Sequence, residues 1–252
     1  MTPARRQQLL AFVARLGLDP VAAGDPGPEA LAVIEEALSH SSAGLAVNHE
    51  RLEFLGDAVL RLAASEFLRQ EQPQLPVGRH AALRAQLVSD RWLAQLAERC
   101  DVAQVWHLGA MAAGDAAGRA TVLAETAEAL IGAIYLAWGG PRGGLEPVQR
   151  WLAPHWHASL SLYLADPDLH NWKSALQEWS QGQGLGLPRY CCSETSRRHG
   201  DPERFSCRVL VSGDAGGAST PEISGEGRGP SRRAAEQAAA AAALRRVRSL
   251  QG

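Results

Sequence analysis

The chain has 252 residues, enough for one large domain or two ordinary ones, and its 46% hydrophobic content supports packed cores. We identify no apolar run near the roughly 20 residues that span a bilayer and no apolar signal-peptide core. We therefore expect a soluble, cytoplasmic protein with no membrane partner. The net charge of −2, taken alone, argues against a polyanionic partner.

The charge is divided unevenly along the chain. Residues 1–169 carry 13 Arg against 19 Asp and Glu, whereas residues 170–252 carry 12 Lys and Arg against 8 Asp and Glu. A basic C-terminal part following an acidic N-terminal part indicates that any polyanion is contacted through the C-terminal part.

Residues 1–164 predict an all-helical domain. Alanine and leucine recur at helical spacing over residues 3–16, 30–39, 51–69, 79–99 and 120–138, and another helix is predicted over residues 145–164. Prolines and glycines separate these stretches. Residues 165–169 break the pattern and are predicted to be a linker.

Residues 170–252 predict a second, smaller domain of the α+β class. A helix is expected over residues 171–181, strands over 189–193, 205–212 and 221–225, and a closing alanine-rich helix over 231–247. This α-β-β-β-α order allows both helices to pack on one face of the sheet. The four cysteines, Cys100, Cys191, Cys192 and Cys207, show no C-x-x-C spacing, so we expect buried, reduced thiols rather than a zinc site.

An acidic motif lies within the predicted helix that starts near residue 50. Glu50, Glu53 and Asp57 are spaced three and four residues apart, so they share one face of a helix whose other positions are apolar. Clustered carboxylates repel one another and are costly to desolvate, which favours a bound hard divalent cation. The simpler alternative is an amphipathic helix with solvated acidic positions. Glu125 and Glu128 form a second such pair on another apolar helix.

Both acidic segments resemble the ribonuclease III family, enzymes that cleave double-stranded RNA. Residues 48–60 resemble its signature helix, and residues 123–133 resemble its second acidic motif. The resemblance implies that Glu53, Asp57, Glu125 and Glu128 hold a catalytic Mg²⁺, for which Mn²⁺ could substitute. It also makes Asp57 and Glu128 catalytic residues and gives Glu50 a supporting catalytic role.

The chain departs from the family pattern at two positions. Glu125 stands where aspartate is common, which adds a methylene to a metal ligand, and Val77 stands where an acidic residue is frequent. Phe54 matches a position that interlocks two subunits, so the resemblance implies a homodimer with Phe54 in its interface. His40 also fits a family pattern, but we interpret it as a structural histidine.

The C-terminal part resembles a double-stranded-RNA-binding domain over nearly all its length. The resemblance implies that RNA is contacted by side chains of the first helix, of the loop after the first strand and of the start of the last helix: Ser174, Gln177, Gln181, His199, Ser231, Arg232 and Arg233. Ser231 is the expected N-cap of that helix. Arginines in a first helical turn oppose the helix dipole, which indicates an external anion such as RNA phosphate.

The sequence therefore predicts a Mg²⁺-dependent endoribonuclease acting on double-stranded RNA. By the resemblance it would leave 5′-phosphate and 3′-hydroxyl ends and process ribosomal-RNA precursors and other structured transcripts. A catalytically weak or inactive double-stranded-RNA-binding protein on the same scaffold is the first alternative, and a phosphohydrolase of small nucleotides is the second.

Overall fold

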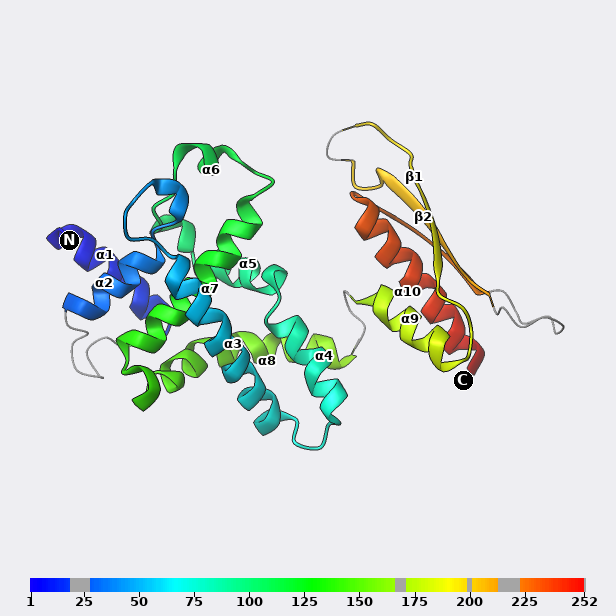
Figure 1. Ribbon diagram of the computed structural model, residues 1–252, viewed down its shortest axis with the longest axis horizontal. Coiled ribbons are helices and arrows are strands. Elements are labelled where there is room, and N and C mark those ends of the chain that lie inside the picture. Colours follow the sequence, from blue (N-terminus) through cyan, green and yellow to red (C-terminus); the bar gives the residue numbers. More distant parts are fainter. Residues whose placement is uncertain (19–27, 166–170, 199–200, 213–222, 252) are drawn as a thin grey trace. The chain divides into compact units, whose positions relative to one another are not determined.

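The computed structural model describes residues 1–18, 28–165, 171–198, 201–212 and 223–251. The chain divides into two compact units, Met1–Ala165 and Asp166–Gly252 (Figure 1). The described part of the first unit is helical, and that of the second contains two helices and a three-stranded sheet. This order confirms the predicted fold class, a mostly α domain followed by an α-β-β-β-α unit. The proposed linker, residues 165–169, lies almost entirely outside the described residues.

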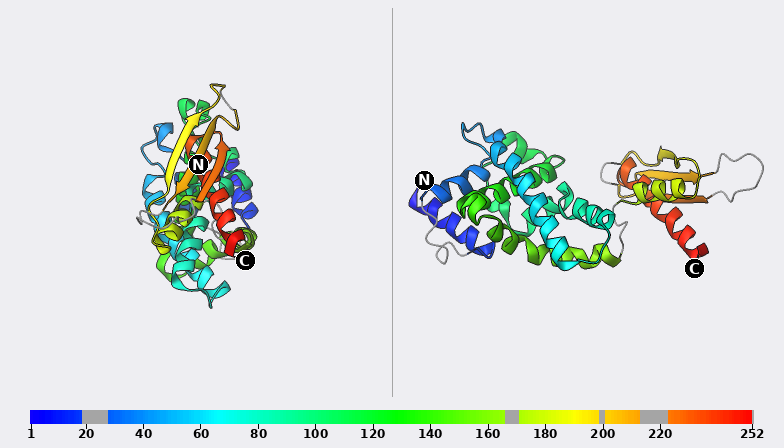
Figure 2. Two further views of the ribbon diagram at one scale, coloured as in Figure 1. Left: turned by 90° about the vertical axis from the view of Figure 1, so that its right-hand side faces the viewer. Right: turned by 60° about the horizontal axis from the view of Figure 1, so that its bottom comes forward.

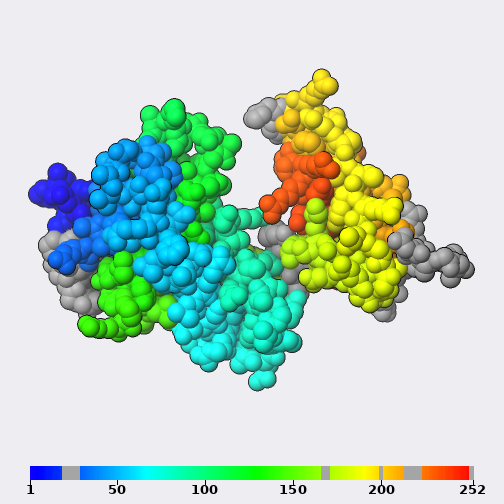
Figure 3. Space-filling view, in the orientation of Figure 1, coloured from blue at the N-terminus to red at the C-terminus, as the bar shows by residue number. Residues whose placement is uncertain are grey.

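The first unit contains the following α-helices: α1 (Pro3–Arg15), α2 (Pro28–Ala37), α3 (Glu50–Glu71), α4 (Val77–Leu87), α5 (Asp90–Arg99), α6 (Ala110–Gly114), α7 (Arg119–Ala137) and α8 (Leu145–Ala165). Short 3-10 turns lie at Ser41–Ala43, Val102–Gln104 and Gly140–Arg142. In the orientation of Figure 3, α3 and α4, in light blue and cyan, form part of the surface of this unit.

One predicted helix is in fact two. The sequence pattern predicted a continuous helix over residues 79–99, whereas α4 ends at Leu87 and α5 begins at Asp90. The Ser89 side chain accepts a hydrogen bond from the backbone N–H of Trp92, which caps α5. A serine N-cap competes with a continuous helix and starts a new one here. Because the apolar residues keep helical spacing on both sides of Ser89, the sequence pattern did not reveal this break.

Helix α7 is at the centre of the first unit. It packs against α3, α5 and α2, and its buried side chains include Leu123, Leu130 and Ile134. By length and composition α7 could cross a membrane, which corrects the expectation from hydropathy that the chain has no such stretch, and 56% of its apolar window is buried inside the protein. Its apolar composition is explained by its position in the core.

Two glycines allow α3 and α7 to cross in close contact. A Cβ atom on Gly56 of α3 would lie 1.8 Å from the carbonyl oxygen of Glu128, and one on Gly132 of α7 would lie 2.3 Å from that of Leu52. Any larger residue would force the two backbones apart. The acidic motifs of α3 and α7 are consequently brought together by main-chain contact rather than by long side chains.

The second unit is a sheet covered on one face by two helices. Strands β1 (Arg189–Glu194), β2 (Phe205–Val211) and β3 (Ile223–Gly229) pair antiparallel in the order β1-β2-β3. Helices α9 (Trp172–Gly182) and α10 (Arg232–Gln251) bury a shared core against them (Figure 2). This core includes Trp172, Leu176, Val209 and Leu244.

The alanine-rich sequence of α10 fits the glycine-rich sequence of β3. A Cβ atom on Gly225 would lie 2.3 Å from the Ala239 carbonyl oxygen, and one on Gly227 would lie 2.2 Å from the Ala239 nitrogen. The predicted strand ended at residue 225, but β3 continues to Gly229. Glycine within a strand marks the close approach of another backbone, and here that backbone is α10.

The prediction of buried, reduced thiols is wrong for three of the four cysteines. Cys192 of β1 and Cys207 of β2 face each other in the strand register and form a disulfide with an S–S distance of 2.02 Å. Cys191 is exposed, while Cys100 is free and half-buried. Spacing along the chain could not reveal the pair, because strand register rather than sequence separation brings the two sulfur atoms together.

Candidate active site

The crossing of α3 and α7 gathers four carboxylates, Glu53 and Asp57 from α3 and Glu125 and Glu128 from α7. Burial, followed by the charges of Asp57 and Glu53, raises the pKa of Glu128 to about 7. Burial, followed by the charges of Glu125 and Glu50, also raises the pKa of Glu53. The structure thus places both predicted acidic pairs in one electrostatic cluster.

One cation partly compensates this cluster. Arg61 lies one turn after Asp57, and its Nη2 is 2.7 Å from Asp57 Oδ1 while its Nε donates to both oxygens at 2.8 and 2.9 Å. Asp57 and Arg61 are 40% and 55% exposed, and ion pairs at such exposure contribute about 0–1 kcal/mol. A divalent cation could therefore displace Arg61 at little cost.

Sequence reasoning missed Arg61 and two further neighbours. The i, i+4 spacing from Asp57 was a usable signal for Arg61. Asp90, at the start of α5, adds repulsion to Glu128, and only the tertiary structure brings it near. His49, buried directly before α3, lies with its Nε2 3.3 Å from Glu53 Oε2.

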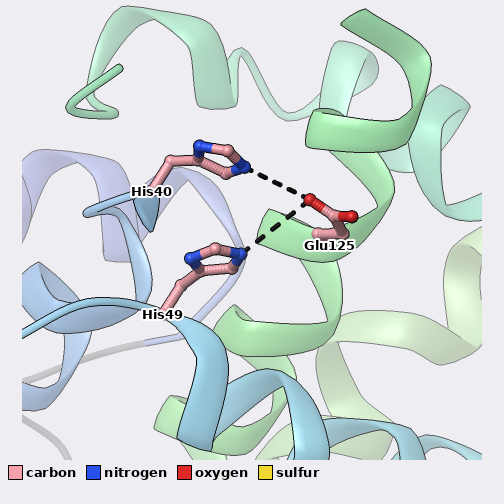
Figure 4. A group of neighbouring side chains, drawn as sticks. All are labelled: His40, His49 and Glu125. Atoms are coloured by element: carbon pink, nitrogen blue, oxygen red, sulfur yellow. Dashed lines mark hydrogen bonds and ion pairs between the residues drawn. The ribbon is translucent and has the colours of Figure 1, made fainter. Parts of the chain in front are cut away.

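His40 is also in this site rather than remote from it. Its Nε2 lies 3.2 Å from Glu125 Oε2, and its ring stacks on that of His49 with centroids 4.6 Å apart (Figure 4). Burial and then the neighbouring His40 lower the pKa of His49. The structural interpretation of His40 is incomplete, because its hydrogen bonds are satisfied in part by a residue of the acidic cluster.

The carboxylates fit a hard divalent cation such as Mg²⁺. They supply oxygen donors only, and they come from two helices fixed by backbone contact. Burial and then mutual repulsion raise the pKa values of Glu53 and Glu128. Glu50 is exposed in the first turn of α3, where its N–H donates to Asn48 Oδ1 at 3.0 Å. The charge of Glu50 contributes to the raised pKa of Glu53, and its exposure is consistent with a position at the edge of the acidic cluster.

We expect cation binding to release a proton from Glu128 at mildly acidic pH. Because the pKa of Glu128 is raised to about 7, it is mostly protonated near pH 6, and a bound cation requires the carboxylate. Calorimetric titration with Mg²⁺ in two buffers of different ionisation enthalpy should show about one proton released at pH 6 and almost none at pH 8. Glu128→Gln should abolish this release, and its persistence in that variant would contradict the assignment.

Without a bound cation, the raised pKa of Glu128 makes the free energy of unfolding depend on pH in a defined direction. The folded state holds the Glu128 proton between the ordinary value of 4.5 and about 7, so the unfolded state binds fewer protons in that window. The contribution of Glu128 to the free energy of unfolding therefore falls as pH rises through this window.

Two other positions singled out by the sequence lie on the surface. Phe54 is 84% exposed on the first turns of α3, and Val77 is 83% exposed at the start of α4. Val77 supplies no ligand, so the described structure places no carboxylate at the position where the family pattern often has one.

The residues predicted to contact RNA are accessible wherever they are described. Ser174, Gln177 and Gln181 are exposed on α9. Ser231 Oγ accepts the N–H of Ala234 at 3.2 Å, as expected of an N-cap. Arg232 and Arg233 are exposed in the first turn of α10, with the Arg232 Nε 3.3 Å from Glu236. His199 lies outside the described residues.

Comparison with known proteins agrees with this architecture. A family described as ribonuclease-III-like matches residues 31–152, and the double-stranded RNA binding motif matches residues 172–247. The chain is similar to Ribonuclease 3 of Prochlorococcus marinus, with 46% identity over 86% of this chain and 82% of the relative. It is similar to Ribonuclease 3 2 of Nostoc sp., with 39% identity over 96% and 93%, and to Ribonuclease 3 of Gloeobacter violaceus, with 39% identity over 99% and 95%.

The fold, the acidic cluster and these matches define an endonuclease unit followed by a double-stranded-RNA-binding unit. The chain belongs to the ribonuclease 3 family and is an endoribonuclease of that family.

Proposed function

We propose that the protein hydrolyses phosphodiester bonds of double-stranded RNA with Mg²⁺ and leaves 5′-phosphate and 3′-hydroxyl ends. We further propose that it acts in the cytoplasm on base-paired stems of ribosomal-RNA precursors and other transcripts. The observation that supports this most directly is the convergence of Glu53, Asp57, Glu125 and Glu128 at the α3–α7 crossing, in a chain that also carries an RNA-binding unit.

The four carboxylates would hold the divalent ion. When bound, the ion would activate water, stabilise the leaving oxygen and neutralise charge at phosphorus. With an ion bound, Asp57 would exchange its pairing with Arg61 for the ion, and Glu128 would serve as a ligand in its deprotonated form. The released Arg61 guanidinium, still on the same face of α3, can then pair with RNA phosphate.

Duplex cleavage tests the proposal directly. Labelled duplex RNA and the matching single strand are incubated with the full chain, with Mg²⁺ and with a chelator. We expect Mg²⁺-dependent cuts in the duplex alone. Duplex binding without cleavage would favour the inactive RNA-binding alternative, for which the exposed Val77 is the supporting observation. Preferred turnover of small nucleotides would favour the phosphohydrolase.

We expect Arg233 to contribute more to RNA affinity than Arg232. Glu236 already neutralises part of the Arg232 charge at 3.3 Å, whereas the exposed Arg233 can neutralise a phosphate. Arg233→Gln should reduce the slope of log affinity against log salt by about one, as expected for one lost phosphate contact. Fluorescence anisotropy at several KCl concentrations measures the slope. A larger reduction in Arg232→Gln than in Arg233→Gln would contradict this ranking.

A homodimer with Phe54 in its interface is part of the proposal. An aromatic side chain that is 84% exposed on a helix forgoes about 1.5–3 kcal/mol of burial energy, which a partner subunit could restore. Two symmetry-related sites could address the two strands of one duplex. Sedimentation equilibrium should show a dimer that Phe54→Ala weakens at least about tenfold. Leu162→Ala, which removes another exposed apolar side chain (62% exposed on α8), is the matched control and should leave the dimer unchanged.

A further inference from the structure

Two buried or largely buried histidines lie beside two carboxylates of the site. His40 precedes the 3-10 turn Ser41–Ala43, and His49 precedes α3. Figure 4 shows both rings pointing toward Glu125 of α7. His40 Nε2 lies 3.2 Å from Glu125 Oε2, and His49 Nε2 lies 3.3 Å from Glu53 Oε2 and 3.9 Å from Glu125 Oε2.

Backbone amides determine which ring nitrogen carries the proton. The N–H of Ser42 donates to His40 Nδ1 at 3.1 Å, and the N–H of Ser41 donates to His49 Nδ1 at 3.2 Å. A backbone amide can only donate, so Nδ1 of each ring is an acceptor without a proton. A neutral imidazole keeps one N–H, which must then be on Nε2. Both histidines therefore present N–H donors to the carboxylates.

A further hydrogen bond supports the same tautomer for His40. The N–H of Gly109 donates to Ser42 Oγ at 3.1 Å, and this hydroxyl lies 2.8 Å from His40 Nδ1. Since Nδ1 is an acceptor, the hydroxyl donates to it. A Cβ atom on Gly109 would lie 2.1 Å from the Ser42 carbonyl oxygen, so close backbone contact keeps this chain of donors in place.

Direct metal binding by the histidines is the competing explanation. One ligand atom each from His40, His49 and Glu125 lies within 4.8 Å of the others, and two histidines with a glutamate can bind Zn²⁺. A metal on Nε2 needs the lone pair of that nitrogen, however. With backbone N–H groups on both Nδ1 atoms, neither neutral ring has this lone pair free.

We propose that His40 and His49 are positioning residues. His40 holds Glu125 by an Nε2–H hydrogen bond to Oε2, His49 holds Glu53 by the electrostatic contact of its Nε2 with Oε2, and the second oxygen of each carboxylate is left for a divalent ion. The inference rests on the proposed function in so far as these carboxylates receive such an ion. Hydrogen-bonded supports of this kind typically change metal affinity or activity about 10- to 100-fold.

The proposal also explains why glutamate can serve at position 125. An aspartate would bring its carboxylate closer to α7 by about one carbon–carbon bond, roughly 1.5 Å. The 3.2 Å contact with His40 would then be lost. The extra methylene of Glu125 is thus matched by the His40 donor, which fixes its longer and more mobile side chain.

Mn²⁺ binding to the full chain, measured by isothermal titration calorimetry, tests the proposal independently of cleavage. His40→Ala should weaken binding at least about tenfold, while His40→Gln, whose amide can still donate, should restore most of the affinity. His157→Ala is the matched control, because His157 lies 3.7 Å from Glu71 on the same unit outside the acidic cluster, and it should bind as the unaltered chain does.

The Glu125→Asp background separates positioning from a merely structural role. In that background His40→Ala should weaken Mn²⁺ binding less than about threefold, because the shorter side chain no longer reaches His40. Equal losses in both backgrounds, or a Gln variant as weak as the Ala variant, would overturn the proposal. So would ¹⁴N couplings in the electron spin echo spectrum of bound Mn²⁺, which would show direct ligation, or an unaltered chain that binds no Mn²⁺. Failure to cleave duplex RNA with Mn²⁺ binding intact would instead reject the proposed function.

Discussion

Asp57→Asn is expected to lower duplex cleavage about 10³-fold while leaving duplex binding unchanged. The change keeps the shape of the side chain and removes one negative ligand from the α3–α7 cluster. Losing such a ligand costs several kcal/mol of transition-state stabilisation, and each 1.36 kcal/mol is a factor of ten in rate. Single-turnover cleavage measures the first effect, and anisotropy with labelled duplex measures the second.

A matched control is available on α8. Glu146 and Arg150 form an exposed i, i+4 ion pair at 2.6 Å, similar to the 2.7 Å pair of Asp57 and Arg61. Glu146→Gln removes the same kind of surface pair away from the cluster and should leave cleavage intact. Cleavage that survives Asp57→Asn, or binding that falls in parallel with it, would reject the assignment of catalysis to the helical unit and binding to the second unit.

Gly56→Ala is expected to destabilise the helical unit by about 2 kcal/mol or more, although alanine is a better helix former than glycine by about 1 kcal/mol. The new methyl would lie 1.8 Å from the Glu128 carbonyl oxygen and 3.1 Å from the Gly132 nitrogen. Both contacts are with backbone, so neither can be relieved by a side-chain rotation. Differential scanning calorimetry of the full chain should show a lower transition temperature, and cation affinity should fall because α3 and α7 separate.

Gly78→Ala is the control for helix propensity. Gly78 lies on α4, and a Cβ atom there would meet nothing within 4 Å. This change should be neutral or stabilising by about 0.5–1 kcal/mol. If Gly56→Ala proved equally harmless, the two backbones would have room to spare at the crossing, and some other contact would have to align the acidic pairs.

The sequence predicted the elements and the acidic residues because both depend on short-range pattern. Helical spacing of apolar residues indicated α3 and α7, and the i, i+3 and i, i+4 spacing of Glu53, Asp57, Glu125 and Glu128 placed the carboxylates on helix faces. The prediction was wrong where one continuous helix and two consecutive helices have the same spacing of apolar residues. A serine cap at Ser89 divides one apparent helix into α4 and α5, although the apolar spacing continues across it.

The parts that could not be predicted depend on contacts between distant segments. The Cys192–Cys207 disulfide follows from strand register, and the continuation of β3 to Gly229 follows from the fit of glycines against the alanines of α10. His40 fits a family pattern, but that pattern alone did not distinguish a neighbour of the active site from a structural histidine. Only its distance to Glu125, 85 residues away, and the amide bound to its Nδ1 reveal that it faces the cluster as a donor.

By itself, the sequence determined the fold class, the order of the two units and the identity of the four carboxylates, because propensity, periodicity and side-chain charge are local properties. The tertiary structure alone decided how these groups act on one another. At the glycine-mediated crossing of α3 and α7, burial and then the charges of Asp57 and Glu53 raise the pKa of Glu128. The segment before α3 brings the Nε2 atoms of His40 and His49 to 3.2 Å from Glu125 and 3.3 Å from Glu53. Electrostatic coupling and hydrogen bonding depend on distance and direction in space, which the linear spacing of residues does not contain.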